Sequence, residues 1–304
     1  MKVLSLFDGI SCGMAALERA GVPVERYVAY EIDDNAIKIS KENYPQIEHC
    51  GDVTTADFTK YCGFDLLIGG SPCQGFSSSG KGLNFNDPRS KLFFEYVRAL
   101  REVKPTYFLL ENVNMRKEWR DVITEHVGVE PIYINSALVS AQNRQRLYWT
   151  NIPEVTLPPD RGVELCDILE NIDFPDPAAI RGRRLNKATI IGRRLDARGH
   201  RQDYNKDIKT TQCLEVRKTN QNKSNCLTTV DKDNVLTILP PGRYPDAFNR
   251  KLPFRYYTTT EYERLQTLPD GYTRGVAESA ARKALGNCWT VDVIAHIFTH
   301  LKEN

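Results

Sequence analysis

The first half of the sequence alternates between short apolar runs and amphipathic runs. Apolar runs typical of buried strands cover residues 3–7, 26–32, 64–70, 106–111, 132–136 and 147–152. Helical patterns lie between them at residues 14–20, 35–43 and 90–103. Strands that alternate with helices predict a mostly parallel sheet with both faces covered. We therefore expect an α/β fold, with a Rossmann-like, doubly wound sheet of about seven strands.

A proline-rich stretch at residues 152–162 separates this half from a segment of different character. Pro153, Pro158 and Pro159 prevent regular strand pairing there. Only short β-like pieces follow, at 226–230 and 235–239, before helical patterns return at 260–266 and near the end. We expect a main domain over residues 1–162, a small, irregular, β-containing domain over 163–252, and a return segment over 253–304 that completes the main domain.

Charge is distributed unevenly along the chain. The net charge is only +2, but residues 181–250 hold 16 Lys and Arg against 7 Asp and Glu. A basic segment on a mildly acidic body is typical of nucleic-acid binding, and a solvated basic loop is the alternative. No apolar stretch approaches the about 20 residues of a membrane span, and the apolar amino end meets Asp8 too soon for a signal sequence. We expect a cytoplasmic protein that binds no membrane.

The cysteines argue against a metal site. The chain has 8 cysteines, and they are scattered without a Cys-x-x-Cys pair. This spacing predicts neither a zinc site nor a thioredoxin-like motif, so we expect no metal. For most of these thiols the simplest interpretation is a small core residue.

Three polar runs follow predicted strand ends. The first run, residues 71–77, reads Ser-Pro-Cys-Gln-Gly-Phe-Ser and contains Cys73. The second, Glu111 and Asn112, lies at the end of the strand expected at 106–111. The third contains Arg144 and Arg146 and precedes the last strand. Doubly wound sheets bind their ligands at such strand ends. A thiol, a carboxylate and two arginines can attack and hold a pyrimidine ring. Each alone could be inert, but the ordered set favours chemistry.

The run from Phe7 to Gly13 follows the first strand and opens a helix. Glycines there allow close backbone approach, and the helix start offers unpaired N–H groups. The spacing is not Gly-x-Gly-x-x-Gly, which disfavours a nicotinamide enzyme. Glu31 ends the second strand, where a carboxylate can accept ribose hydroxyls, although it could also simply face water. Asp52 is expected at the end of the third strand.

With these runs in this order, and with Gly286-Asn287 near the end, the chain resembles the DNA cytosine-5 methyltransferase family of bacterial or phage type. Trp289 resembles the mammalian de novo branch, whereas Ser5 and Ser11-Cys12 depart from the usual pattern. The resemblance covers nearly the whole chain except residues 166–250, where the family varies in target recognition. It implies a catalytic and cofactor-binding main domain, a target-recognition domain, and methylation of carbon 5 of cytosine in double-stranded DNA by a monomer.

The resemblance also implies S-adenosylmethionine as cofactor and a set of residues that bind it. Phe7 would lie against the adenine, Glu31 would bind the ribose, and Asp52 with Val53 would bind the adenine edge. The methionine end would be held around Asp8, Gly9, Ile10 and Gly13. Ile32, Leu92 and Trp289 would form apolar walls, and Asn287 would close the site.

For the reaction, the resemblance implies that the Cys73 thiolate adds to carbon 6 of a flipped cytosine. Glu111 would hold N3 and the amino group, and Arg146 would hold O2. Arg144 would brace the catalytic loop and the sugar-phosphate, and Pro72 would shape the loop that carries the thiol. No residue stands out as the base that removes the carbon 5 proton, so a water is an equal candidate.

DNA contacts are expected from three regions. The loop after Cys73 offers Gln74, Ser77, Ser79 and Lys81, and Asn112 lies beside the catalytic carboxylate. The basic segment offers phosphate contacts from Arg183, Arg184, Arg193, Arg194 and Arg198. Thr228 and Thr229 are expected to contact the backbone of the DNA. The signature around Arg255 and Glu261 would organise the inserted domain.

Two other functions stay open at this point. One keeps the chemistry and changes the substrate to tRNA, as one branch of the family does. The other is a nucleic-acid-binding regulator without catalysis, although the presence of Cys73, Glu111 and Arg146 argues against it.

Overall fold

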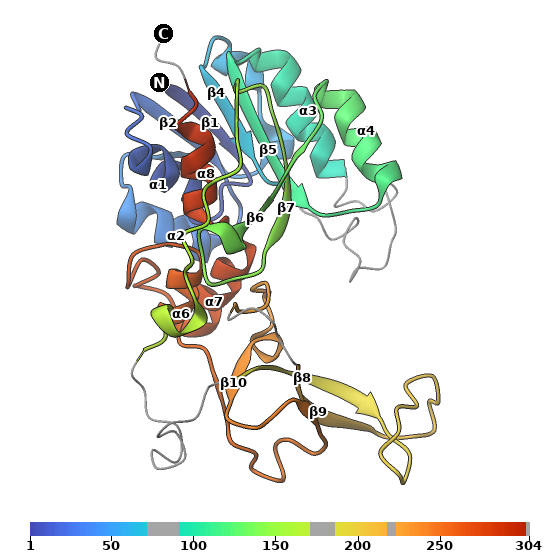
Figure 1. Cartoon of the computed structure of the whole chain (residues 1–304). Helices are drawn as coiled ribbons and strands as arrows, with labels where there is room; N and C mark the ends of the chain where they lie inside the picture. The colour runs from blue at the N-terminus through green and yellow to red at the C-terminus, as the bar shows by residue number, and fades with distance from the viewer. Residues whose placement is uncertain (72–90, 171–185, 218–222, 302–304) are drawn as a thin grey trace.

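The computed structural model describes residues 1–71, 91–170, 186–217 and 223–301. Within these ranges the chain forms a seven-stranded sheet and a separate five-stranded sheet. Figure 1 shows the larger sheet with its helices as one body and the smaller sheet as a second body beyond helices α6 and α7. Both the amino-terminal and the carboxyl-terminal elements belong to the larger body.

The seven-stranded sheet has the order β3-β2-β1-β4-β5-β7-β6. Its strands are β1 Lys2–Leu6, β2 Arg26–Tyr30, β3 Glu48–His49, β4 Leu66–Gly69, β5 Tyr107–Val113, β6 Ile132–Asn135 and β7 Gln145–Thr150. The first five pair in parallel, and β7 runs antiparallel between β5 and β6. The strand order reverses between β1 and β4, which is where such sheets bind ligands. The predicted doubly wound, mostly parallel sheet is confirmed.

Helices cover both faces of this sheet because the strand side chains alternate. Val3, Leu66 and Ile68 point to a core shared with helices α1 Cys12–Arg19, α2 Asp34–Asn43 and α8 Val291–Phe298. Leu4 and Leu67 point to the opposite core, under helices α3 Lys91–Val103 and α4 Lys117–Val127. Helix α8 packs beside α1, so the two ends of the chain meet in one layer (Figure 1).

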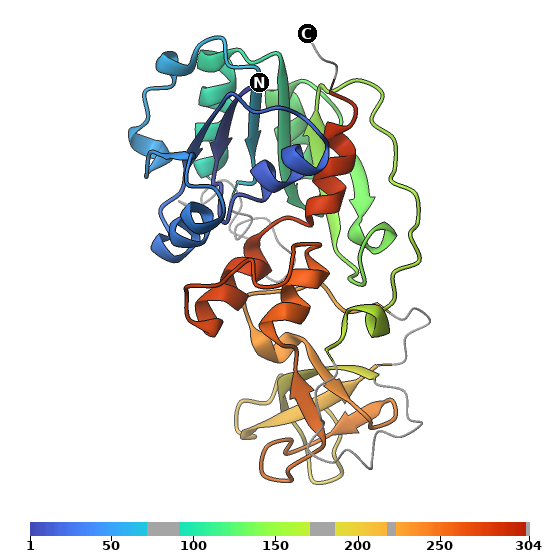
Figure 2. The same cartoon turned by 90° about the vertical axis from the view of Figure 1, so that its left-hand side faces the viewer.

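The five-stranded sheet is antiparallel throughout and has the order β11-β9-β8-β10-β12. Its strands are β8 Asn186–Arg194, β9 Thr210–Val216, β10 Val235–Thr237, β11 Gly242–Tyr244 and β12 Phe254–Tyr256. A small core of Ala188, Ile190, Leu214, Val216 and Val235 lies on one face. Figure 2 shows this sheet well separated from the parallel one.

The strand piece expected at residues 226–230 is wrong, because side chains take its backbone N–H groups. The N–H of Leu227 donates to Oε1 of Gln142 at 2.9 Å, and the N–H of Val230 donates to Oγ1 of Thr228 at 3.1 Å. Those donors are therefore lost to strand pairing, and the segment is irregular. The piece expected at 235–239 is present as β10.

Short helices join the two sheets. They are α5 Leu165–Ile168, α6 Thr259–Leu265 and α7 Glu278–Asn287. Elsewhere in the described chain, 3-10 turns include η1 Val53–Thr55, η2 Phe58–Tyr61, η4 Ser136–Leu138 and η6 Asp231–Asp233. Thr258 and Glu261 cap α6 reciprocally. The fully buried Glu261 also receives two hydrogen bonds from Arg255, at 2.7 and 2.8 Å. This ion pair fixes the return of the chain from β12 into α6.

None of the helices in the described ranges is both long and apolar enough to cross a membrane.

Candidate active site

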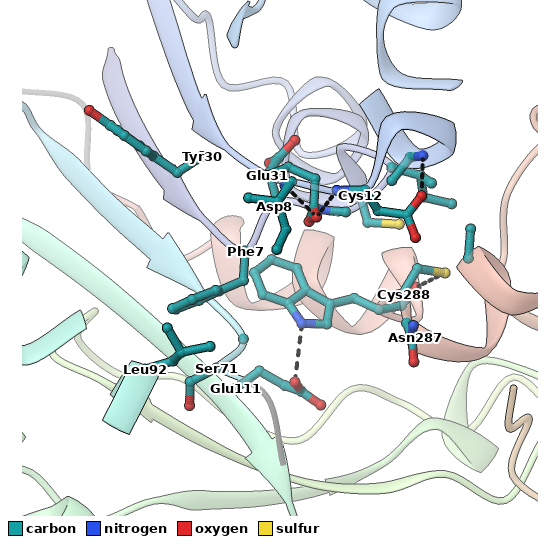
Figure 3. A pocket seen from close by; sticks show the side chains of 18 of the residues that line it. Phe7, Asp8, Cys12, Tyr30, Glu31, Ser71, Leu92, Glu111, Asn287 and Cys288 are labelled. Carbon is teal, nitrogen blue, oxygen red and sulfur yellow. Dashed lines mark hydrogen bonds between the residues drawn. The ribbon is translucent and has the colours of Figure 1, made fainter. Parts of the chain in front are cut away.

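A cavity of about 360 Å³ opens at the carboxyl ends of β1, β2, β4 and β5. Its volume is in the range of small-molecule pockets. Of the residues predicted to bind the cofactor, those that line the cavity are Phe7, Asp8, Gly9, Ile10, Glu31, Ile32, Asp52, Val53, Leu92, Asn287 and Trp289. Figure 3 shows Phe7 and Leu92 on one wall and Asn287 and Cys288 on the other.

Gly13 is the predicted cofactor residue that does not line the cavity. A Cβ at this position would lie 2.3 Å from Cδ1 of Ile68 and 2.8 Å from the hydroxyl of Tyr27. Gly13 therefore lets helix α1 pack closely on the sheet. Gly13 thus lies behind the wall of the cavity and supports the loop after β1 through packing.

The loop after β1 is held in an uncommon conformation. Phe7, Gly9 and Ser11 all have φ near +60°, which costs a residue with a side chain about 1–3 kcal/mol. The carboxylate of Asp8 stabilises the loop by accepting hydrogen bonds from Ser5 Oγ at 2.6 Å, from Tyr27 OH at 2.7 Å, and from Ser11 Oγ. Burial raises the pKa of Asp8, and these three donors oppose that rise.

Glu31 ties the ends of β1 and β2 together. Its Oε2 accepts from the N–H of Gly9 at 2.8 Å, and its Oε1 accepts from the N–H groups of Ile32 and Asp33 at 2.8 and 2.9 Å. The alternative of a carboxylate that merely faces water does not describe it. Ile32 is 72% exposed at the rim of the cavity, an unusual position for a large apolar side chain.

Asp52 lies at the end of β3, as expected, and caps the turn η1. Its Oδ1 accepts from the N–H of Thr54 at 2.8 Å and from Oγ1 of Thr54 at 2.9 Å. The carboxylate is therefore oriented by the chain itself. Asp8, Glu31 and Asp52 together make this end of the cavity acidic.

Glu111 stands at the other end of the cavity, where β5 ends. Its Oε1 lies 2.8 Å from Nε of Arg146. Its Oε2 accepts a hydrogen bond from the indole Nε1 of Trp289 at 3.2 Å, which is the dashed line at Glu111 in Figure 3. A Cβ at Gly70 would lie 2.9 Å from that Nε1 and 3.1 Å from Oε2. Glycine at this position thus permits the contact between Trp289 and Glu111.

Arg144 is 3% exposed, and its guanidinium forms hydrogen bonds with backbone carbonyls inside the protein. Its guanidinium donates to the carbonyls of Leu227 at 3.2 Å, Gly286 at 3.4 Å and Cys288 at 2.7 Å. The last two carbonyls lie at the end of α7, where a cation is favourable. Burial alone would lower the pKa of Arg144, and Cys226, Glu111 and Cys288 together raise it. Its expected contact with the DNA backbone stays a prediction.

Asn112 is 1% exposed and fixes the chain at Ser71. Its Nδ2 donates to the carbonyl of Ser71 at 3.3 Å and to Oγ of Ser71 at 3.1 Å. The described part of this loop ends there, beside Glu111. The predicted residues Pro72, Cys73, Gln74, Ser77, Ser79 and Lys81 lie outside the described residues.

The arginines of β8 have partners within the protein. Arg193 is 9% exposed and binds Glu215 through two hydrogen bonds, at 2.8 and 3.1 Å, and Asp203 at 3.2 Å. Arg194 donates to the carbonyls of Asp203 and Ile208, both at 3.1 Å. Both guanidinium groups therefore secure the loop between β8 and β9. Their predicted phosphate contacts stay predictions, and Arg183 and Arg184 lie outside the described residues.

Thr228 and Thr229 lie against the end of α7. A Cβ at Gly286 would come within 2.4 Å of the carbonyl oxygen of Thr228, so glycine permits this close approach. Oγ1 of Thr228 donates to Asp233 at 2.7 Å. Residues 226–229 thus pack on the larger body beside Arg144. No sequence pattern had indicated this contact or the hydrogen bond between Trp289 and Glu111.

Within the described residues, no group of three His, Cys, Asp or Glu side chains could hold a metal ion. A doubly wound sheet with an acidic, partly apolar cavity at its switch point defines a Rossmann-like protein that binds a nucleoside-containing cofactor. Comparison with known proteins identifies the family. The profile of the C-5 cytosine-specific DNA methylases matches residues 1–127 and 136–303. The chain belongs to this family, which uses S-adenosylmethionine as methyl donor.

Relatives in sequence are phage and bacterial methyltransferases. The type II methyltransferase M1.ScrFI of Lactococcus lactis subsp. cremoris is 30% identical, over 99% of this chain and 78% of its own. The orphan methyltransferase M.SPRI of Bacillus phage SPR is 38% identical over 51% of this chain. That match spans 38% of the phage protein's length, and a match to the orphan methyltransferase of phage rho11s spans 35% of that protein.

Solved structures share the fold. The methyltransferase EhMeth of Entamoeba histolytica has a TM-score of 0.70 at 16% identity, over 99% of this chain and 97% of its own. The Dnmt2 methyltransferase of S. pombe has a TM-score of 0.63 at 18% identity, over 98% and 97%. The resemblance predicted from the sequence and the predicted fold class are thus both confirmed.

Proposed function

We propose that this protein methylates carbon 5 of cytosine in double-stranded DNA. The observation that carries the proposal is the arrangement of Glu111 and Arg146, which are paired at 2.8 Å at one end of a cavity whose other end holds Glu31 and Asp52. A base-binding end and a cofactor-binding end thus share one cavity. Membership of the C-5 cytosine-specific DNA methylase family supports this reading.

The cavity fits S-adenosylmethionine by the chemistry of its walls. Phe7, Ile32 and Leu92 offer apolar surfaces to an adenine ring. The carboxylates of Glu31 and Asp52 suit hydroxyl and amino donors, and the acidic end suits a ligand with a positively charged sulfur. When bound, the cofactor supplies an electrophilic methyl group. We propose that Phe7, Glu31 and Asp52 with Val53 bind the adenosine part, and that the loop around Asp8, Gly9 and Ile10 holds the methionine end. Ile32, Leu92 and Trp289 form the apolar walls, and Asn287 closes the site. Gly13 supports the loop after β1 from behind the cavity wall.

The proposed nucleophile is Cys73, two residues after the described Ser71. Its thiolate sulfur forms a bond to carbon 6, and the electrons of the 5–6 double bond shift into the ring. Carbon 5 would then form a bond to the methyl group, and the bond between that methyl group and the sulfonium sulfur of the donor would break, which leaves a neutral thioether as the product. Loss of the carbon 5 proton to a base re-forms the double bond and expels the sulfur. The enzyme regains its free thiolate.

Glu111 and Arg146 hold the ring while this happens. N3 and O2 are neighbouring atoms on one edge of cytosine, and Glu111 and Arg146 are neighbours in the structure. We propose that Glu111 holds N3 and the amino group and that Arg146 holds O2. The amino group distinguishes cytosine from thymine. The donors to O2 stabilise the charge that develops when sulfur adds.

The five-stranded sheet is the proposed target-recognition domain. Residues 181–250 hold 16 Lys and Arg against 7 Asp and Glu, whereas the whole chain has a net charge of only +2, and this local excess is as expected for phosphate contacts. The sheet extends to Tyr256, just beyond the boundary expected at residue 252, and residues 226–229 pack on the larger body. We propose the domains 1–162, 163–252 and 253–304, with the end of the second domain extended to Tyr256 and with residues 226–229 packed on the larger body. The base would leave the duplex to reach Glu111, as in other enzymes that modify bases.

The relatives come from bacteria and phages, and we propose the same setting here, with a monomer that acts in the cytoplasm. Bisulfite sequencing of DNA from cells that express the protein tests the function. We expect methylated cytosines within one sequence context, and none with Cys73→Ser. Unmethylated DNA together with methylated tRNA in the same cells would show that the substrate is tRNA and not DNA.

A further inference from the structure

A second thiol lies between the two arginines of the proposed base-binding end. Sγ of Cys226 is 3.5 Å from Nη1 of Arg144 and 3.9 Å from Nη2 of Arg146. Arg146 in turn binds Glu111 through Nε at 2.8 Å. The four side chains therefore form one row, in which positive and negative groups can alternate from Arg144 to Glu111.

The backbone holds Cys226 in this place. The N–H of Ser224 donates to the carbonyl of Ala141 at 2.6 Å, and the N–H of Asn143 donates to the carbonyl of Ser224 at 3.0 Å. A side-chain contact adds to this pairing, because the N–H of Leu227 donates to Oε1 of Gln142 at 2.9 Å. Ser224 and Gln142 are fully buried. Ser224 is thus paired with residues 141–143 and Leu227 is tied to Gln142, and these contacts on both sides of Cys226 hold its thiol beside the arginines.

The charge balance around this row favours a thiolate. Arg144 and Arg146 carry two positive charges, and Glu111 carries one negative charge, so an ionised Cys226 would make the cluster neutral. Burial alone would raise the pKa of Cys226, but Arg144 and Arg146 outweigh burial and lower the pKa below its ordinary value. The thiol of Cys288 also faces Arg144, and Asp233 lies beyond Thr228.

We propose that Cys226 is a positioning residue whose thiolate holds the guanidinium groups of Arg144 and Arg146 at the base-binding end. This inference rests on the proposed function of Arg146. The guanidinium of Arg146 is held at Nε by Glu111 and at Nη1 by the carbonyl of Gln145 at 2.9 Å. Its contact from Nη2 to sulfur is the longest of the three. Nη2 is thus the donor that can turn to the cytosine O2, and the thiolate holds it ready.

The ionisation of Cys226 can be measured without any reference to activity. The far-ultraviolet absorbance of the wild type is titrated against pH, and the titration of Cys226→Ser is subtracted, so that the other thiols cancel. We expect one group with a midpoint below about 8.5, the ordinary value for a thiol. Arg146→Gln should move that midpoint upward. A midpoint at or above the ordinary value would overturn the inference, whatever the substrate of the enzyme.

Kinetics test the positioning role. Cys226→Ala and Cys226→Ser should lower kcat about tenfold, because the charged contact to Nη2 is lost, and should leave the KM for S-adenosylmethionine unchanged. Cys226→Asp restores a negative charge and should recover kcat to within about threefold. It should also remove the thiol's contribution to the acid limb of the pH profile. Cys166→Ser, at an exposed cysteine on α5, is the matched control and should behave as wild type.

The outcomes separate this inference from the proposed function. Full activity of Cys226→Ala, or no recovery with Cys226→Asp in a variant that melts like wild type, would contradict the positioning role alone. Absence of cytosine methylation by the wild type would contradict the proposed function, and the absorbance titration would still decide whether Cys226 is ionised.

Discussion

The indole Nε1 of Trp289 donates a hydrogen bond to Oε2 of Glu111 over 3.2 Å. Trp289 follows helix α7 near the end of the chain, whereas Glu111 belongs to β5, so the contact joins segments that are distant in sequence. Because Trp289 also lines the cofactor cavity, one side chain contacts both ends of the proposed site. The position of the Glu111 carboxylate, the proposed catalytic one, therefore depends on a residue near the carboxyl-terminal helix α8.

Replacing Trp289 with Phe tests this link. Phe keeps an aromatic wall and removes the N–H donor, so Glu111 loses one of its two partners. We expect kcat to fall about ten- to a hundredfold, because a buried hydrogen bond to a charged group contributes about 1.5–3 kcal/mol. Binding of S-adenosylmethionine, measured by calorimetry, should change less than about threefold. Trp119→Phe, on α4, is the control. Unchanged turnover with Trp289→Phe would mean that the indole contributes only its apolar surface.

Gly70→Ala should disturb the same contact sterically. The added Cβ would lie 2.9 Å from Nε1 of Trp289 and 3.1 Å from Oε2 of Glu111, so one of the two must move. We expect a loss of about 1–3 kcal/mol of stability in thermal melting, together with a larger loss of activity than of cofactor binding. Gly242→Ala, where the new Cβ would meet its neighbours at 3.4 Å or more, should be tolerated. Normal turnover with Gly70→Ala would contradict the argument.

Acid should destabilise the five-stranded sheet through Glu215. Arg193 first, and then Arg243, lower the pKa of Glu215 from 4.5 to about 2 against the opposing effect of burial. A carboxylate with a depressed folded pKa contributes stability that is present above its unfolded pKa and is lost as pH falls toward the folded pKa. Glu215→Gln should therefore lower the melting temperature at pH 7, by an amount that shrinks between pH about 4.5 and about 2. A pH-independent difference would exclude this ion pair as the cause.

Two arginines near the β8 to β9 connection should behave differently toward DNA. Arg198 is exposed, whereas Arg193 is bound to Glu215 and Asp203. Arg198→Ala should weaken DNA binding across sequences and reduce the salt slope of binding by about one, with no change in melting. Arg193→Ala should instead lower the melting temperature. An equal effect of both on the salt slope, with equal melting, would show that Arg193 contacts phosphate directly.

Much of the fold could be predicted because apolar periodicity reports burial. Each expected strand of the parallel sheet is present within a few residues of its expected bounds, and the helix expected at 90–103 is α3. The cavity residues could be located for a related reason: polar residues directly after strands meet at one sheet edge. Phe7, Glu31 and Asp52 come from three different strand ends and line one cavity.

The remaining features depend on contacts that the local sequence does not encode. A count of charges cannot tell whether a guanidinium already has partners within the protein. Arg193, a predicted phosphate ligand, binds Glu215, which the pairing of β8 with β9 places beside it. The strand expected at 226–230 is absent because the side chain of the distant Gln142 takes a backbone donor. Gly13 resembled a cofactor glycine, but Ile68 and Tyr27 explain its size.

The most direct measurement is trapping of the covalent intermediate. Duplex DNA with 5-fluorocytosine at the target cannot lose a proton from carbon 5, so the sulfur cannot leave once the methyl group has been transferred. We predict a denaturation-resistant adduct for the wild type in the presence of S-adenosylmethionine, with the modified peptide containing Cys73, a slower adduct for Cys226→Ser, and none for Cys73→Ser. An adduct that survives Cys73→Ser, or a wild type that methylates ordinary DNA and forms no adduct, would contradict the account.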